Sequence, residues 1–206
     1  MNAGFSNLTT LKRHLLAERL RPEITFDDQI TALGLGVAGA IERYCDRQFG
    51  RVVGDTWETP SADRLTFVLP RYPVEAITAI DLRSSYGAAW ESQDPDELLL
   101  QVVGDSGVVT FDVAIGWRGS VVRFTYTGGY WWDTAEDDTG ELPSGATALP
   151  ADLRHAWLLQ CEEIWSRRDN LGVGLTAKPT ERAKLGELDV SPAVRSLLRP
   201  HIRHAS

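Results

Sequence analysis

The chain has 206 residues, 43% of them hydrophobic and 24% charged, which fits one elaborated domain or two small ones and excludes global disorder. Its formal net charge of −8 argues against a surface that binds nucleic acid over its whole extent. No apolar run approaches the roughly 20 residues that cross a bilayer, and no secretory leader is recognisable. We therefore expect no membrane partner, and a reducing compartment for the two distant cysteines.

Two helices are predicted before residue 50. Leucines recur at helical spacing over residues 8–20, and Pro22 then interrupts the pattern. A second helix begins near Asp27 or Asp28, acids that suit the positive end of a helix dipole. Its apolar stripe consists of Ile30, Leu33, Val37, Ile41, Tyr44 and Cys45. The charged residues of the stretch IERYCDRQFG fall outside this stripe, so the stretch is interpreted as a helix end that stops at Gly50.

The second helix also contains GLGVAG, residues 34–39, with the glycine spacing of dinucleotide-binding proteins. That motif requires a strand before it, and the preceding residues have a helical pattern. We expect instead that the small residues Gly36 and Ala40 let another helix approach closely.

Residues 51–130 have the pattern of strands. Short β-branched or aromatic runs bounded by turn residues predict strands within 64–70, 73–85, 97–103, 107–113 and 120–129. In the last run Val122, Phe124 and Tyr126 alternate with polar residues, which predicts one buried face. An antiparallel β insertion is therefore expected. An acidic loop follows over 131–149, and its acids lack the spacing of a calcium loop.

A long central helix is predicted from Pro150 to about residue 171. Its apolar stripe consists of Leu153, Ala156, Trp157, Gln160, Cys161, Ile164 and Trp165. Cys45 and Cys161 lie on the stripes of their helices, so we expect both to be buried and reduced. Residues 172–206 are expected to form an arm with a short helix after Ser191, and His201 and His204 to belong to a solvated tail.

Together these elements predict an α+β protein. Residues 1–50 and 150–171 form a small helical bundle of two N-terminal helices and one long central helix. Residues 51–130 form the antiparallel β insertion, 131–149 the acidic loop, and 172–206 the C-terminal arm with its short helix.

No local motif indicates catalysis or a cofactor, and in particular there is no nucleophile elbow. Two alternatives stay open. A metal-dependent hydrolase could hold a metal through Asp137 and Asp138 of the acidic loop. A monomeric module could bind a glycan or a peptide through the aromatic residues Tyr130 to Trp132.

The order of motifs resembles the head–tail connector, or adaptor, proteins of long-tailed bacteriophages and gene transfer agents. The resemblance covers roughly residues 8–200 and rests on the leucine helix, IERYCDRQF, PRYPVEAITAIDL, FTYTGGY and LPADLRHAWLLQCEEIWSRRD. It implies a non-enzymatic structural protein that forms a ring, normally of twelve subunits, beneath the portal. The ring would extend the channel through which DNA passes without sequence-specific binding, and provide the surface for tail attachment.

The resemblance also implies partners and a location. The expected partners are further copies of the chain, the portal protein and head-closure or tail proteins. The expected location is the head–tail interface of the virion, after a stage in the host cytoplasm.

Two groups of residues are candidate interfaces. The basic, apolar arm is the candidate portal-docking element, with residues Arg182, Lys184, Val194, Arg195, Leu197, Leu198, Arg199 and Ile202. The candidate ring or tail interface comprises Arg43, Arg47, Trp57, Trp90 and Trp117.

Overall fold

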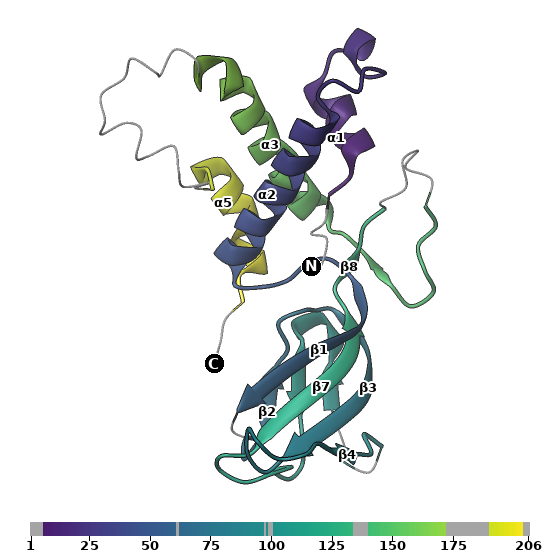
Figure 1. Cartoon of the computed structure of the whole chain (residues 1–206), viewed down its shortest axis with the longest axis vertical. Coiled ribbons are helices and arrows are strands. Elements are labelled where there is room, and N and C mark those ends of the chain that lie inside the picture. The colour runs from purple at the N-terminus through teal and green to yellow at the C-terminus, as the bar shows by residue number, and fades with distance from the viewer. Residues whose placement is uncertain are drawn as a thin grey trace, which may run out of the picture.

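The fold is α+β, as predicted, with helices gathered at one end of the molecule and strands at the other (Figure 1). The computed structural model describes residues 6–60, 62–96, 98, 101–133, 140–171 and 190–203, without the side chains of 168–171. The helices are α1 Leu8–Leu15, α2 Asp27–Cys45, α3 Ala151–Leu171 and α5 Pro192–Leu198, with 3-10 turns at Glu18–Leu20, Gly104–Ser106 and Arg199–His201. No described helix is long and apolar enough to cross a membrane.

Nine strands are described. They are β1 Val52–Pro60, β2 Thr66–Val68, β3 Val74–Arg83, β4 Glu91–Gln93, β5 Gln101–Val103, β6 Val108–Thr110, β7 Val121–Gly128, β8 Tyr130–Trp131 and β9 Thr147–Ala148. A four-stranded antiparallel sheet has the order β1-β7-β3-β4, and a three-stranded antiparallel sheet has the order β2-β6-β5.

The helices share one apolar core, which joins the first fifty residues to the last sixty. α3 contacts α1, α2 and α5, and α1 also contacts α2. The predicted stripes supply this core. Eight of their residues are 0% exposed: Ile30, Val37, Ile41 and Cys45 of α2, and Leu153, Ala156, Trp157 and Cys161 of α3. Helical periodicity therefore predicted the buried faces of both long helices correctly.

Helix boundaries differ from the predicted ones. α1 ends at Leu15, because Leu16 is already extended, and only a 3-10 turn follows. α2 ends at Cys45, where Asp46 adopts the left-handed conformation with φ 49° that the prediction assigned to Gly50. Tyr44 was predicted on the buried stripe, yet it is 36% exposed, and its ring lies 5.9 Å from the guanidinium of Arg195.

A close helix approach occurs at Gly34, two residues before Gly36, the first of the residues expected. A Cβ added to Gly34 would lie 2.6 Å from Leu11 Cδ1 and 3.3 Å from Trp157 Cζ2. The carbonyl of Gly34 also accepts a hydrogen bond of 3.0 Å from Trp157 Nε1. The absent side chain thus lets α1 and α3 meet at one point of α2.

The two antiparallel sheets enclose a second core. Phe124 of β7 lies between Phe67 of β2 and Phe111, with ring centroids 5.3 and 6.2 Å away. Val122, Phe124 and Tyr126 are buried while Arg123 and Thr125 are partly exposed, which confirms the predicted alternation of β7. This β module, residues 52–128, is formed by one continuous segment.

The predicted acidic loop is anchored to the helical core at its start. Tyr130 and Trp131 pair in parallel with Thr147 and Ala148. Trp132 packs edge-on against Trp157, with ring centroids 5.2 Å apart. The segment 131–149 is therefore not a solvated loop throughout, which corrects the prediction, and residues 134–139 with Asp137 and Asp138 lie outside the described residues.

Candidate interaction surfaces

The junction between helices and β module is built around Arg47, which the sequence analysis assigned to a ring or tail interface. Arg47 follows α2 and is only 5% exposed. Its guanidinium donates a hydrogen bond to the carbonyl of Tyr72 and lies 3.4 Å from the Tyr72 ring centre and 5.2 Å from that of Tyr130. Its contacts thus lie within its own chain, so the structure places this residue in the interior and not on a surface.

A second buried arginine, Arg71, holds the other side of the junction and was missed by the sequence analysis. It is 2% exposed, and its Nε lies 2.7 Å from Asp55 Oδ2. It also donates to the carbonyl of Gly50 and to Gln48 Oε1. Because Gln48 and Gly50 directly follow α2, Arg71 fixes the β module to the end of that helix.

The last described residues, 201–203, contact both sides of the same junction and are called the C-terminal strap. The backbone N–H of Arg203 donates to Cys45 O at 2.8 Å, and its guanidinium donates to Val68 O at 2.7 Å. His201 Nε2 lies 2.8 Å from Asp152 Oδ2. Burial raises the pKa of Asp152, but the hydrogen bond and the charge of His201, together with backbone hydrogen bonds, outweigh it, so this pKa is lowered overall. His201 is therefore packed and not solvated, which corrects the prediction; His204 lies outside the described residues.

The apolar stripe of the C-terminal arm packs on its own chain. Val194 and Leu198 of α5 are 0% exposed in the helical core, and Leu197 and Ile202 pack against it. Ser191 N donates to Gln160 Oε1 of α3 at 2.9 Å. The expectation that the arm does not pack on its own helical bundle is thus wrong, whereas its docking onto a portal stays a prediction. The apolar side chains of α5 gain a partner because α3 presents its own stripe to them.

The charged residues of the arm lie differently. Arg199 is exposed, and the guanidinium of Arg195 lies 5.9 Å from the ring centre of Tyr44 on α2. Arg43 of α2 is also exposed. The candidate docking residues Arg182 and Lys184 lie outside the described residues.

The three candidate tryptophans of the β module have three different environments. Trp57 is partly buried and stacks on Phe124, with ring centroids 6.0 Å apart. Trp90 lies beneath the guanidinium groups of Arg83 and Arg123, at 4.2 and 4.3 Å from its ring centre. Only Trp117, which is 59% exposed, presents most of its surface to solvent.

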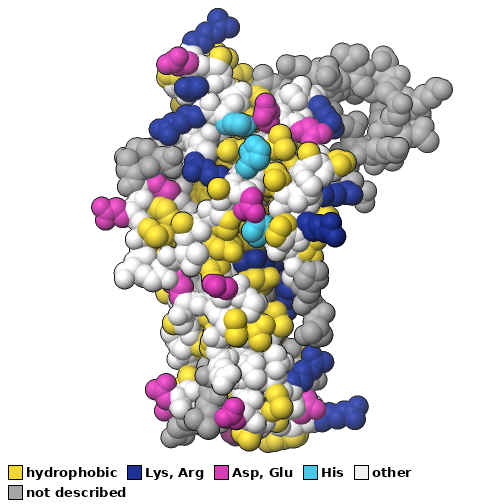
Figure 2. All heavy atoms as spheres, turned by 180° about the vertical axis from the view of Figure 1, so that it is seen from behind, with side chains coloured by type: hydrophobic (Ala, Val, Ile, Leu, Met, Phe, Trp, Pro, Cys, Tyr) yellow, Lys and Arg dark blue, Asp and Glu magenta, His cyan; other side chains and the backbone are white. Residues whose placement is uncertain are grey.

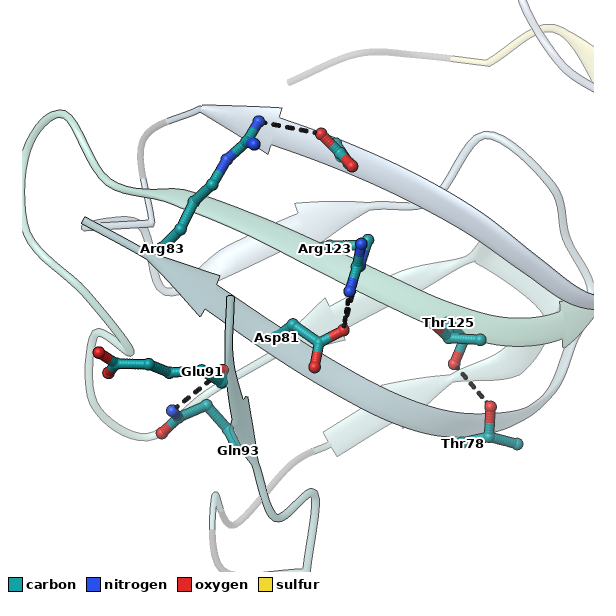
Figure 3. Close-up of polar contacts among 8 residues, drawn as sticks. Thr78, Asp81, Arg83, Glu91, Gln93, Arg123 and Thr125 are labelled. Carbon is teal, nitrogen blue, oxygen red and sulfur yellow. Dashed lines mark hydrogen bonds and ion pairs between the residues drawn. The ribbon is translucent and has the colours of Figure 1, made fainter. Parts of the chain in front are cut away.

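The outer face of the four-stranded sheet is covered by polar pairs across its strands (Figure 3). Arg123 on β7 pairs with Asp81 on β3 at 2.9 Å, and Arg83 pairs with Glu58 on β1 at 3.2 Å. Thr78 Oγ1 donates to Thr125 O at 3.1 Å. Because these groups satisfy one another, this face is a weaker candidate for a partner than the loops at its end.

Those loops carry an exposed apolar group, here called the distal tip. It consists of Leu65, Tyr86, Val113 and Trp117, which are 48, 67, 67 and 59% exposed. The loops lie at the end of the β module far from the helices, where hydrophobic side chains are also visible from behind (Figures 1 and 2). The loop after β1 and the loop before β7 are joined by the hydrogen bond from Gly116 N to Ala62 O.

The site of the proposed glycan-binding module is partly filled by the protein itself. Tyr130 stacks on Phe49, and Trp132 packs on Trp157. A hollow of about 300 Å³ remains between Trp131, Asp133 and Arg154. Within the described part of the chain, no group of three or more His, Cys, Asp or Glu side chains is placed to hold a metal ion.

Comparison with known proteins connects this fold with virus-like particles. No family model matches the chain, and no curated protein matches it. A solved structure, the neck of an empty gene transfer agent particle computed with C6 symmetry, contains a chain similar over 98% of this chain and 91% of its own, with 14% identity and a TM-score of 0.61. The virion of a native gene transfer agent particle gives the same values.

A third structure, the neck of the native particle computed with C12 symmetry, matches 100% of this chain and 94% of the other, with 15% identity and a TM-score of 0.57. At this identity the likeness concerns the fold. The chain therefore has the same α+β fold, over nearly its full length, as chains found in gene transfer agent neck structures.

Proposed function

We propose that the chain is a head–tail connector that forms a ring beneath the portal of a phage or a gene transfer agent. The observation that carries this proposal is the fold shared over 98% of the chain with a chain in a particle neck structure. The cyclic symmetries of those neck structures support a ring of this chain, and C12 favours twelve subunits. The ring would extend the DNA channel, and its location would be the head–tail interface.

The distal tip is the proposed surface for tail attachment. Its exposed aromatic residues, Tyr86 and Trp117, are of the type that contributes most to protein interfaces. The tip lies at the end of the molecule opposite the helices, so a ring could hold one component at each end (Figure 1). The helical end, with the exposed Arg199, would then face the portal.

A structural role also agrees with the charge of the chain. A channel wall that neutralised phosphates would bind DNA in a salt-dependent way and slow its passage. A subunit of net charge −8, repeated around a ring, disfavours such binding.

The test is to delete the gene in a strain that produces particles and to examine the particles by electron microscopy. We expect DNA-filled heads without tails, and rescue by the wild-type chain supplied from a plasmid. A tagged copy should be found at the neck in tailed particles. Tailed, infectious particles in the deletion strain would rule out the connector function.

A further inference from the structure

A hollow of about 470 Å³ lies at the junction, where the end of α2 and the C-terminal strap approach the β module (Figure 1). Its charged lining residues are Arg43, Arg47 and Arg203 together with Glu42 and Asp46. Three arginines thus line one space in a chain whose net charge is −8. We call this space the junction hollow.

Arg47 is the most deeply buried of these charged residues, with 5% of its surface exposed. Its guanidinium lies among the rings of Phe49, Tyr72 and Tyr130. Among the described residues, no acid forms an ion pair with Arg47, and its Nε has no hydrogen-bond partner. A buried charge without a counterion is costly, and aromatic faces offset only part of that cost. A negatively charged acceptor in the junction hollow would therefore be bound favourably.

The other two arginines add further donors to the same space. The Nε of Arg203 is also buried without an acceptor in the described part of the chain. Its Nη1 lies 3.9 Å from Asp46 Oδ2, which is too far for a hydrogen bond. Arg43 is exposed and forms no ion pair with any acid that the structure describes. All three guanidinium groups thus retain N–H groups for a ligand.

The charge of the junction hollow indicates which anion fits. Three cations and two carboxylates line it, which leaves one positive charge. A single positive charge matches a carboxylate better than a phosphate monoester, which carries about −1.5 to −2 at pH 7. DNA is held by rows of Lys and Arg that neutralise several phosphates, whereas Glu42 and Asp46 would repel a phosphate backbone here.

We propose that the junction hollow binds a carboxylate through Arg43, Arg47 and Arg203. A planar guanidinium group can donate two parallel hydrogen bonds to a carboxylate, which makes such pairs strong and specific. The carboxylate belongs to a small free anion or to an acidic side chain of a neighbouring protein, which present the same chemical group. Arg47 and Arg203 also donate to Tyr72 O and Val68 O of the β module, so a bound carboxylate would stabilise the junction.

Gly39 offers a way to fill the junction hollow without changing an arginine. It lies within α2 and lines the hollow. A Cβ added to Gly39 would meet only Arg43 Nη1, at 3.5 Å, which is ordinary van der Waals contact. Leucine also has a higher helix propensity than glycine, so Gly39→Leu should occupy the hollow and keep the fold. Arg43→Gln removes one exposed cation, and Arg64→Gln, an exposed arginine next to the distal tip, is the matched control.

The first measurement is the melting temperature of the full chain in 0–100 mM sodium acetate, with sodium chloride keeping the ionic strength constant. A ligand that binds the folded state raises the melting temperature. For half-saturation on the order of 10 mM, the wild type and Arg64→Gln should gain about 3–6 °C. Arg43→Gln should need about tenfold more acetate, because hydrogen bonds to a charged group are lost. Gly39→Leu should not respond to acetate.

Two results of this titration would overturn the proposal. Equal gains in all four proteins, or no gain in the wild type, would show that acetate does not bind the junction hollow. A larger response to sodium phosphate or to a short DNA duplex than to acetate would assign the hollow to phosphate. Arg43 is exposed, so its replacement tests the site even where Gly39→Leu loses its fold.

The second measurement distinguishes the two sources of the carboxylate. The Gly39→Leu chain is supplied from a plasmid to the deletion strain, beside the wild-type chain. We expect few tailed particles, which assigns the carboxylate to a neighbouring protein, whereas tailed particles at the wild-type level assign it to a free anion. This measurement rests on the proposed connector function. The acetate titration does not, so failure of the connector function leaves the binding site to be judged on its own.

Discussion

The helical core and the β module are stabilised in different ways. The helical core joins distant parts of the sequence, α1 and α2 at one end and α3 and α5 at the other, through apolar contacts around Trp157. The β module closes on itself within residues 52–128, around Phe124. Between them lies a junction held by the buried arginines Arg47 and Arg71. The comparison indicates that apolar packing stabilises each part, whereas polar contacts fix how the parts meet.

The largest expected effect concerns the helical core. Trp157→Ala removes a fully buried ring and its hydrogen bond to Gly34 O, so we expect a loss of about 3–5 kcal/mol in the free energy of unfolding. Urea denaturation followed by circular dichroism measures it. Trp117→Ala is the matched control, because that ring is 59% exposed, and should change stability little. Equal losses for the two variants would contradict the assignment of Trp157 to the core.

The next effect concerns the junction. Arg71→Ala leaves the carboxylate of Asp55 and the carbonyl of Gly50 without their buried partner, so we expect a loss of about 3 kcal/mol. The double variant with Asp55→Ala should be less destabilised than the sum of the single variants, because no unpaired charge remains. Additive losses, measured by urea denaturation, would show that the pair does not act as a unit.

A smaller effect is expected at the C-terminal strap. Arg203→Ala removes the side-chain hydrogen bond to Val68 O, which ties the strap to the β module, and should cost about 1–3 kcal/mol. Hydrogen exchange should increase at the junction, around residues 45–50 and 68–72, and stay unchanged in the centre of β7. Equal increases throughout the chain would indicate global destabilisation and not a local strap.

The dependence of stability on pH separates the two cores. Burial raises the pKa of Cys45 and of Cys161 from 9.0 to about 12. Below about pH 9 the thiols are protonated in both the folded and the unfolded state, so their contribution to stability is fully present. That contribution is lost as the pH rises from about 9 toward 12, by about 1 kcal/mol per thiol and pH unit. The double variant Cys45→Ala, Cys161→Ala should show a flatter dependence in this range.

Tyr126 provides the corresponding group of the β module. Burial raises its pKa from 10.0 to about 12, so its contribution is lost only above about pH 10. Between pH 9 and 10 the wild type should therefore lose stability through its helical core alone. Rapid reaction of native Cys45 and Cys161 with a thiol reagent at pH 8 would contradict their burial.

Much of each element could be predicted from the sequence because its signal is local. The spacing of Ile30, Ile41, Trp157 and Cys161 predicted the buried faces of α2 and α3, since an amphipathic helix needs only its own period. The alternation around Phe124 predicted the inner face of β7 for the same reason.

The candidate sites were predicted less well, because they depend on which elements meet. Arg43 and Arg47 lie one turn apart at the same helix end, yet Arg43 is exposed and Arg47 is buried. The rings of Phe49, Tyr72 and Tyr130, which surround the guanidinium of Arg47, account for this difference. Nothing local to Arg71 marks it as buried, since its partners Gln48, Gly50 and Asp55 precede it by 16 residues or more.

The sequence by itself thus determined the α+β class, the apolar stripes and the separation of acidic and basic segments, which are properties of short stretches of chain. Tertiary structure decided that α5 packs on α3, that His201 pairs with Asp152 and that Trp132 joins the helical core. The physical reason is that burial and pairing free energies depend on surfaces contributed by residues far apart in the chain. Local periodicity indicates which side chains seek a partner, and only the folded chain determines which partner each one meets.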